Sequence, residues 1–192
     1  MAEVVVFHHA LGVTSGVLGF ADTLRDAGHI VHVPDVYEGQ VFSDLSLGVA
    51  HAQSIGFGEL IGRGVAAALE LPPEVVYLGM SLGVLPAQQL AQTRAGARGA
   101  VLLYSFVPPS EFSPSWPGGV PVQIHGMDAD PFFAGDGDID AARAFMADAS
   151  DAELFVYPGE GHLFADSSSS DFDAGAAALL TERTLAFLAA RG

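Results

Sequence analysis

The chain contains no cysteine and no lysine, and all seven of its basic residues are arginines. The lack of cysteine excludes disulfides, thiolate metal sites and a cysteine nucleophile. The lack of lysine excludes Schiff-base catalysis and the phosphate-binding lysine of a P-loop. The formal net charge is -16 and the pI is about 4.4. This charge repels nucleic acid and anionic lipid surfaces, and no local basic patch offsets it, so we expect neither as a partner.

Long hydrophobic runs are also missing. No uninterrupted apolar stretch approaches the length of a membrane span, and the first residues, MAEVVVFHH, lack the basic segment of a signal peptide. We therefore expect a soluble, cytoplasmic protein. Half of the 192 residues are apolar, which is enough to bury a large core without metals or disulfides. The sequence predicts one domain over residues 1–192.

Short β-branched runs alternate with longer helical patterns, which predicts a mostly parallel sheet with helices on both faces. Six strands are expected at Val4–Phe7, Ile30–Val33, Val75–Leu78, Ala100–Leu103, Val120–Ile124 and Glu153–Tyr157. Helices are expected from Thr14 or Ser15 to Gly28, over much of Asp44–Leu69, from Ser81 to about Thr93, from near Asp138, and over Phe172–Leu188. Several glycines predict a break within Asp44–Leu69, and four prolines predict an ordered irregular loop over Ser105–Gly119.

Residues Gly79–Gly83 form the pattern GxSxG between the apolar run VVYL and a helical segment. This is the strand, sharp turn and helix setting of a nucleophile elbow. Glycine is needed on both sides because the helix backbone comes close to the strand, while the serine takes a strained backbone conformation. We expect the Ser81 hydroxyl to project at the carboxyl end of the sheet and the Leu82 N–H to stabilise an oxyanion. The alternative is a glycine-rich turn with a capping serine.

A serine nucleophile needs an imidazole base and a carboxylate that holds the tautomer of that imidazole. In α/β-hydrolases the acid and the histidine follow the serine in this order, each after a later strand. The segment HGMDADPFF offers Asp128 and Asp130, and PGEGHLF offers His162. Asp130 is the preferred acid because Pro131 fixes the turn after it, and Asp128 is the alternative. His162 is the favoured base because it stands alone in the last loop.

The remaining histidines and a group of acids have simpler interpretations. His125 lies at a strand end and is expected to support the acid turn. His8 and His9 are adjacent on an extended segment, so we expect one to be buried against the site and the other to point outward. The three histidines in or beside the early strands and helices are expected to be structural or exposed: His29, His32 and His51. Three acids that lack the spacing of a calcium loop are interpreted as a helix cap and a solvated first turn: Asp136, Asp138 and Asp140.

Over nearly its whole length the chain resembles the dienelactone hydrolase family. The matching stretches are HALGV, GHIVHVPDVYEG, GMSLG, YPGEGHLFAD and AAALLTERTLAFL. The resemblance implies an α/β-hydrolase fold, a triad of Ser81, Asp130 and His162, and an oxyanion hole made by the N–H groups of Ala10 and Leu82.

Three positions depart from the pattern of the family's type members. Ser81 stands where they have cysteine, and His9 where they have a glutamate that interacts with that cysteine. Asp166 stands where they have an arginine that binds the substrate carboxylate. If Asp166 faces the pocket, Asp166→Arg is expected to favour an anionic lactone over a neutral ester.

The leading hypothesis is a serine hydrolase that cleaves small carboxylic esters or lactones without a cofactor. Aromatic residues near the expected mouth favour a small apolar or aromatic substrate group. The expected pocket residues are His9, Tyr37, Phe106, Trp116, Phe132 and Asp166, with Phe42 and Phe133 nearby. Thioesterases and amidases use the same triad, and an α/β-hydrolase fold can bind a ligand without catalysis, so both remain alternatives.

Overall fold

The computed structural model describes residues 1–192, and a six-stranded parallel sheet forms its centre. The strand order is β2-β1-β3-β4-β5-β6, so the chain moves to one edge first and then crosses β1 to build the rest. The strands are β1 (Glu3–Phe7), β2 (Ile30–His32), β3 (Val76–Met80), β4 (Gly99–Leu103), β5 (Val122–Met127) and β6 (Ala152–Tyr157).

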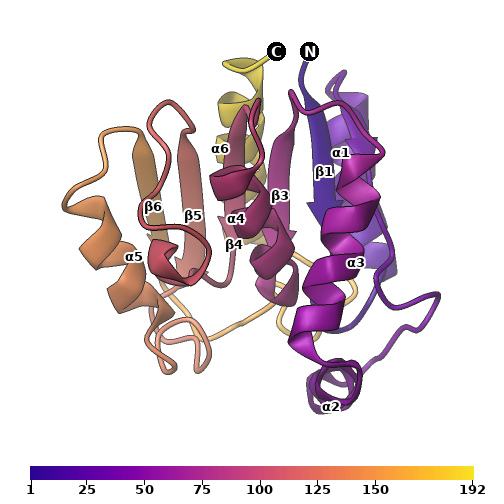
Figure 1. The fold of residues 1–192 in the computed structure, drawn as a ribbon. Helices are drawn as coiled ribbons and strands as arrows, with labels where there is room; N and C mark the ends of the chain where they lie inside the picture. The colour runs from indigo at the N-terminus through magenta and orange to yellow at the C-terminus, as the bar shows by residue number, and fades with distance from the viewer.

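Helices cover both faces of this sheet. In Figure 1, α3, α4 and α5 lie in front of the strands, α1 and α6 lie behind them, and α2 lies at the lower end, where the strands finish. Their bounds are α1 (Ser15–Asp26), α2 (Leu45–Ile55), α3 (Phe57–Leu69), α4 (Val84–Thr93), α5 (Asp138–Met146) and α6 (Ala174–Ala189). The predicted fold class, an α/β-hydrolase sheet with helices on both faces, is confirmed.

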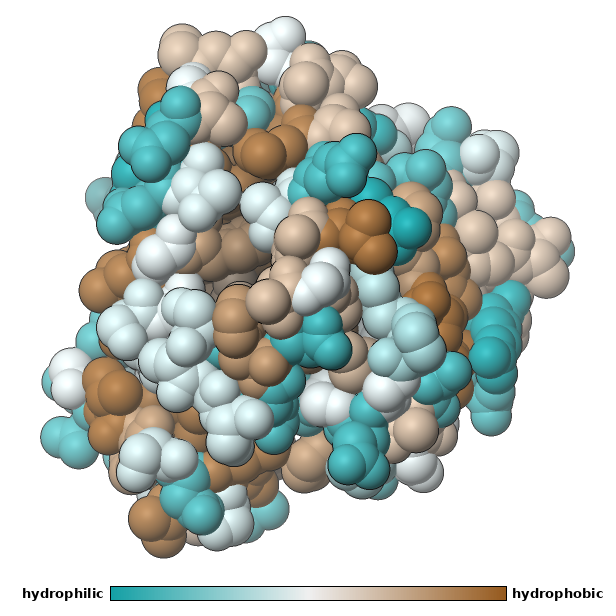
Figure 2. Space-filling model, turned by 180° about the vertical axis from the view of Figure 1, so that it is seen from behind, coloured by the Kyte–Doolittle hydropathy of each residue, from teal (hydrophilic) through white to brown (hydrophobic).

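A hydrophobic cluster lies on each side of the sheet. Leu24 of α1 and Leu180 of α6 belong to one cluster, and Leu90 of α4 and Ile139 of α5 belong to the other. Burying a side chain of this size stabilises the fold by roughly 1.5–3 kcal/mol. On the outer surface seen in Figure 2, hydrophobic and hydrophilic residues are interspersed. No helix combines the length and the apolar character that crossing a membrane requires.

The helix expected over Asp44–Leu69 is two helices, with the break at Gly56 as its glycines predicted. Gly56 has φ 95° and separates α2 from α3. The region Ser105–Gly119 is irregular apart from one short 3-10 helix, Pro109–Glu111.

Several predicted boundaries were wrong by one to three residues, as for β3, which ends at Met80 and not at Leu78. Two of these differences have a clear physical cause. The fifth strand runs from Val122 to Met127 rather than from Val120 to Ile124. The strand begins after Pro121, because Pro121 has no N–H to donate to a neighbouring strand and the Val120 carbonyl accepts a hydrogen bond from the Trp116 indole. At its other end, His125 and Gly126 continue the pairing with β6 despite their turn-like character. The last helix begins at Ala174, not Phe172, because the Asp173 side chain caps it.

The interpretation of Asp138 was also wrong. Gly137, with φ 95°, is the cap position of α5, and Asp138 is its half-buried first residue. The Asp138 carboxylate accepts hydrogen bonds from the Ser105 hydroxyl (2.5 Å) and the Phe106 N–H (3.0 Å). Burial raises the pKa of this carboxyl, against the effect of those bonds. Asp138 therefore fixes the chain after β4 instead of facing solvent.

Candidate active site

Ser81 lies on a sharp turn between β3 and the 3-10 turn Ser81–Gly83 that opens into α4. Its φ of 50° is in the left-handed region, which a residue with a side chain adopts only at a cost. The flanking glycines are required by space. A Cβ on Gly79 would overlap the backbone of Gly83 and Val84, and a Cβ on Gly83 would overlap the end of β1. The predicted elbow geometry is present.

A line of hydrogen bonds runs from Ser81 through His162 to Asp130. The Ser81 Oγ lies 2.8 Å from His162 Nε2, and His162 Nδ1 lies 2.8 Å from Asp130 Oδ2. The His162 side chain is 5% exposed and that of Asp130 is fully buried. Because an ionised carboxylate can only accept, His162 carries its proton on Nδ1 and leaves Nε2 free to accept the hydroxyl proton.

The structure places Asp130, and not Asp128, against His162. Asp130 Oδ1 accepts the Phe132 N–H at 2.8 Å, so both of its oxygens are occupied. Asp128 is exposed, and its carboxylate accepts the Gly159 N–H at 3.0 Å. Asp128 thus ties the acid turn to the loop that carries His162, without touching the imidazole.

Asp171 is a part of the site that the sequence did not reveal. Its carboxylate accepts hydrogen bonds from the N–H groups of His162 (3.2 Å) and Leu163 (3.3 Å) and so fixes the turn that presents the imidazole. Asp171 follows a run of four serines that looks like an ordinary surface turn, and no motif or periodicity marks it.

The side of the His162 imidazole that is open to solvent is bordered by Phe132. The centroids of the two rings lie 4.6 Å apart, and Phe132 is 39% exposed.

The two predicted oxyanion donors, Ala10 and Leu82, lie on segments that pack together. Leu82 is in the first turn of the 3-10 helix, where N–H groups have no partner within the helix. Gly83, in the same turn, packs on the backbone of Phe7 and His8, just before Ala10. Ala10 is buried, and its N–H donates no hydrogen bond to another protein group. The N–H groups of Ala10 and Leu82 are therefore two backbone donors, one on each side of the contact between Gly83 and the end of β1.

The prediction that one of His8 and His9 points outward was wrong. The two side chains do point to opposite sides, but both are buried, because a loop covers each side. His8 Nδ1 donates to the His9 carbonyl (2.7 Å), and its Nε2 accepts the Val36 N–H (3.2 Å). Burial is the main cause that lowers the pKa of His8 to about 4.

The Asp166 carboxylate is buried and fully occupied by the protein's own donors, so the expectation that it faces the pocket was wrong. Oδ2 accepts from His9 (2.7 Å) and Thr14 (2.6 Å), and Oδ1 accepts twice from Ser168 (2.6 and 2.7 Å). Burial alone would raise the pKa of Asp166, but the bonds from His9, Ser168 and Thr14 outweigh it and hold the pKa well below its usual range.

Among the predicted pocket residues, only Phe132 lies beside the imidazole with an exposed ring. Tyr37 and Phe106 are fully buried core residues, as are His9 and Phe133. Trp116 packs against Phe145 and lines a cavity of about 480 Å³ near the start of β6. This is the end of the sheet where the strands begin, whereas Ser81 lies where they finish. The placement of Trp116 was wrong because its loop runs from one end of the sheet to the other. A hollow of about 10 Å³ lies next to Leu82.

The other histidines lie away from Ser81. His125 is buried within β5, and its ring bonds Tyr157 (2.9 Å) and Gln123 (3.3 Å) rather than the acid turn that it was expected to support. The three early histidines contact the N-terminal segment or neighbouring aromatic rings: His29, His32 and His51. No group of three or more histidine or acidic side chains is arranged to hold a metal ion.

Solved structures with the same fold span nearly the whole chain. A candidate dienelactone hydrolase from Klebsiella pneumoniae subsp. pneumoniae MGH 78578 has a TM-score of 0.76 and 18% identity, over 98% of this chain and 87% of that one. A dienelactone hydrolase-like promiscuous phosphotriesterase from metagenomic libraries has a TM-score of 0.72 and 19% identity, over 100% and 87%. The dienelactone hydrolase from Anabaena variabilis ATCC 29413 has a TM-score of 0.69 and 17% identity, over 99% and 87%.

At this level of identity the solved structures establish the fold alone, and no curated protein sequence matches the chain. The family comparison is more specific, because the model of the dienelactone hydrolase family matches residues 1–191. The chain therefore belongs to the dienelactone hydrolase family and is an α/β-hydrolase.

Proposed function

We propose that this protein cleaves carboxylic esters or lactones through a covalent acyl-enzyme on Ser81. The observation that carries the proposal is the line of two 2.8 Å contacts from the Ser81 hydroxyl through His162 to the buried Asp130. A serine hydroxyl becomes a nucleophile only when a base takes its proton as it attacks, and this arrangement supplies the base and the group that orients it.

In the first half of the reaction, His162 Nε2 takes the Ser81 proton while Oγ forms a bond to the substrate carbonyl carbon. The carbonyl oxygen gains the negative charge, and the N–H groups of Ala10 and Leu82 donate to it. When the carbonyl re-forms, the bond to the alcohol oxygen breaks and His162 gives that oxygen its proton. In the second half, His162 takes a proton from water, the hydroxide attacks the acyl-enzyme, and Ser81 regains its proton as the acid leaves.

The distribution of charge favours a substrate without a negative charge. The buried Asp166 occupies the position at which type members of the family use an arginine for the substrate carboxylate. No arginine contacts Ser81, Asp130 or His162. Arg98 lies beside Pro121, at the end of the sheet where the strands begin. The other six arginines interact with other acids, carbonyls or rings: Arg25, Arg63, Arg94, Arg143, Arg183 and Arg191. An anionic lactone therefore has no cation to bind.

The hollow of about 10 Å³ next to Leu82 is lined by apolar residues, among them Phe7, Val36 and Leu60, and by neither Ser81 nor His162. It has room for about one water molecule and is not an acyl pocket. The open side of the imidazole is bordered instead by the exposed Phe132 ring, which offers an apolar surface to the alcohol group. We infer a preference for neutral esters or lactones whose alcohol part is apolar.

The test is hydrolysis of a short nitrophenyl ester and labelling by a fluorophosphonate, with wild-type protein and Ser81→Ala. Wild type should hydrolyse the ester and take up one label, whereas Ser81→Ala should lose about 10⁴-fold or more of kcat and all labelling. Its Tm should stay roughly unchanged, because alanine occupies the same strained position with little loss of packing. A folded wild type that neither hydrolyses esters nor takes the label would favour a ligand-binding protein, and thioester and amide substrates would be assayed in parallel.

A further inference from the structure

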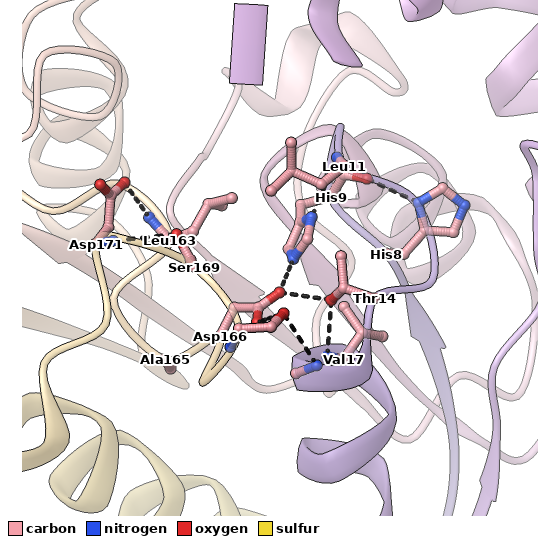
Figure 3. A network of polar contacts seen from close by, with 12 residues as sticks. His8, His9, Leu11, Thr14, Val17, Leu163, Ala165, Asp166, Ser169 and Asp171 are labelled. Carbon is pink, nitrogen blue, oxygen red and sulfur yellow. Dashed lines mark hydrogen bonds and ion pairs between the residues drawn. The ribbon is translucent and has the colours of Figure 1, made fainter. Parts of the chain in front are cut away.

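A second aspartate–histidine pair lies outside the line from Ser81 to Asp130. His9 Nε2 and Asp166 Oδ2 are 2.7 Å apart, and the two side chains are 0% and 1% exposed. Figure 3 shows this pair between the loop that follows β1 and the loop that follows β6, with the first turn of α1 beside it. The Thr14 hydroxyl donates to the same oxygen of Asp166 at 2.6 Å.

The hydrogen bonds of the His9 ring fix its tautomer. Its Nδ1 accepts the Leu11 N–H at 3.2 Å, so Nδ1 carries no proton and the proton is on Nε2, where it is donated to Asp166. The ring therefore spans from the Asp166 carboxylate to the peptide N–H that follows Ala10. This bridge holds the peptide that follows Ala10, while the His9 carbonyl before Ala10 accepts from the His8 ring and the Gly12 N–H. The Ala10 N–H has no protein acceptor.

Asp166 is also attached to the segment that presents the imidazole. Its N–H donates to the Leu163 carbonyl at 3.0 Å, and Leu163 directly follows His162. One buried residue thus joins the loop with the free Ala10 N–H to the turn that carries His162. The Thr14 hydroxyl on Asp166 and the Gly16 N–H on Ser168 also join these two loops, but only the bond through His9 leads to the peptide next to Ala10.

We propose that Asp166 is a positioning residue that acts through His9 to hold the Ala10 N–H where a substrate oxyanion forms. The proposal rests on the proposed function, because it needs a reaction with a developing oxyanion. Asp166 touches neither substrate nor Ser81. A backbone donor displaced by about 1 Å loses much of its effect on the transition state, so the geometry of this bridge acts on kcat more than on KM.

The two oxygens of Asp166 provide an internal control. Oδ2 faces His9 and Thr14, which belong to the loop after β1, whereas Oδ1 faces Ser168 of its own loop. Ser168→Ala removes one bond to Oδ1 and the acceptor of the Gly16 N–H, and it leaves the Oδ2 contacts in place. His9→Phe keeps the ring volume and removes the bridge, while Thr14 and Ser168 still satisfy the carboxylate.

The experiment compares Asp166→Ala, His9→Phe and Ser168→Ala on a short ester and on its thionoester, in which the carbonyl oxygen is sulfur. The first two variants should lower kcat for the ester by on the order of 10-fold to 100-fold, with KM changed by less than about threefold. Sulfur is a weak acceptor and gains little from the N–H donors, so kcat for the thionoester should fall much less. Ser168→Ala should leave both kcat values within about threefold of wild type.

His9→Phe decides the matter if Asp166→Ala does not fold. A folded His9→Phe protein with wild-type kcat on the ester overturns the proposal, and so does an equal loss on ester and thionoester, because a general loss of structure does not distinguish the two substrates. If wild type itself shows no hydrolysis and no labelling of Ser81, the proposed function fails. If wild type is active and His9→Phe matches it, only the positioning role fails.

Discussion

The two buried aspartate–histidine pairs have almost the same distances and differ in what lies beyond the imidazole. Asp130 and His162 are 2.8 Å apart, and Asp166 and His9 are 2.7 Å apart. The second nitrogen of His162 faces the Ser81 hydroxyl, whereas the second nitrogen of His9 faces the backbone N–H of Leu11. A hydroxyl can give up its proton to a base at neutral pH during attack, and a peptide N–H cannot.

This difference separates the roles of two chemically equal pairs. In the proposed mechanism, the carboxylate of the first pair orients an imidazole that exchanges protons with Ser81 and substrate. In the second pair, the carboxylate orients an imidazole that only holds backbone. The two histidines also have opposite tautomers, with the proton on Nδ1 of His162 and on Nε2 of His9. The partner of the second nitrogen, and not the presence of an aspartate, decides the chemistry.

The largest expected effect comes from breaking the first pair. Asp130→Asn should lower kcat on a neutral ester by about 10³-fold or more, because the amide no longer selects the Nδ1–H tautomer of His162. Asp128→Asn is the matched control, since it changes a carboxylate on the same turn that bonds only Gly159. It should cost about tenfold or less.

Circular dichroism of the two variant proteins is the control for folding. An inactive Asp128→Asn beside an active Asp130→Asn would mean that the hydrogen bond to His162 does not serve catalysis.

Placing the family's arginine in the second pair should damage the fold instead of creating a binding site. Asp166→Arg removes a carboxylate that four hydrogen bonds reach, and the longer side chain meets Gly16, which already lies against the Asp166 carboxylate. We expect a loss of about 3–5 kcal/mol in the free energy of unfolding. Urea titration of wild type and variant measures it. A stable Asp166→Arg protein with improved kcat/KM on an anionic lactone would place this position in the pocket after all.

The histidine next to the second pair should make the fold sensitive to acid. Burial lowers the pKa of His8 to about 4, with the His9 carbonyl and Asp35 opposing that effect only in part. The unfolded chain binds this proton near pH 6.5, so stability is present above that pH and is lost as the pH falls toward 4, by roughly 3 kcal/mol.

Urea unfolding of wild type and His8→Gln at about pH 7 and pH 4 isolates this contribution, since buried His125 and other groups titrate in both proteins. The difference between the two pH values should be smaller for His8→Gln. Equal differences would show that His8 does not carry this pH dependence.

The smallest effect concerns the open side of His162. Phe132→Ala removes a ring that packs 4.6 Å from the imidazole, and it should raise KM for an ester with an aromatic alcohol group by about threefold to tenfold. The corresponding methyl ester should change less, because it makes less contact there. Identical KM changes for the two esters would place the alcohol group elsewhere.

The first pair could be predicted from the sequence because its signals are local. Gly79 and Gly83 fix the turn around Ser81, and Asp130 and His162 each follow a strand whose end is visible in the sequence. Parallel strands bring these ends to one edge, so the order along the chain suffices to assemble them.

The pairing of His9 with Asp166 could not be predicted, because the two residues lie 157 positions apart in two separate family stretches, HALGV and YPGEGHLFAD. The sequence placed both residues in the expected pocket, and only the packing of two loops and α1 shows that they are buried against each other. The predicted position of Trp116 was wrong for a related reason, since an irregular loop can carry a side chain to either end of the sheet. Asp171 is likewise defined by the turn that its carboxylate caps, which exists only in the folded chain.

The most direct test of the central claim is to trap the acyl-enzyme. Wild-type protein is quenched in acid during turnover of a short nitrophenyl ester and digested, and the acylated peptide is sequenced by mass spectrometry, with Ser81→Ala treated in parallel. The account predicts an acyl group on Ser81 in wild type and no acylated peptide in Ser81→Ala. An acyl group on another residue, or steady ester hydrolysis by Ser81→Ala at the wild-type rate, would contradict it.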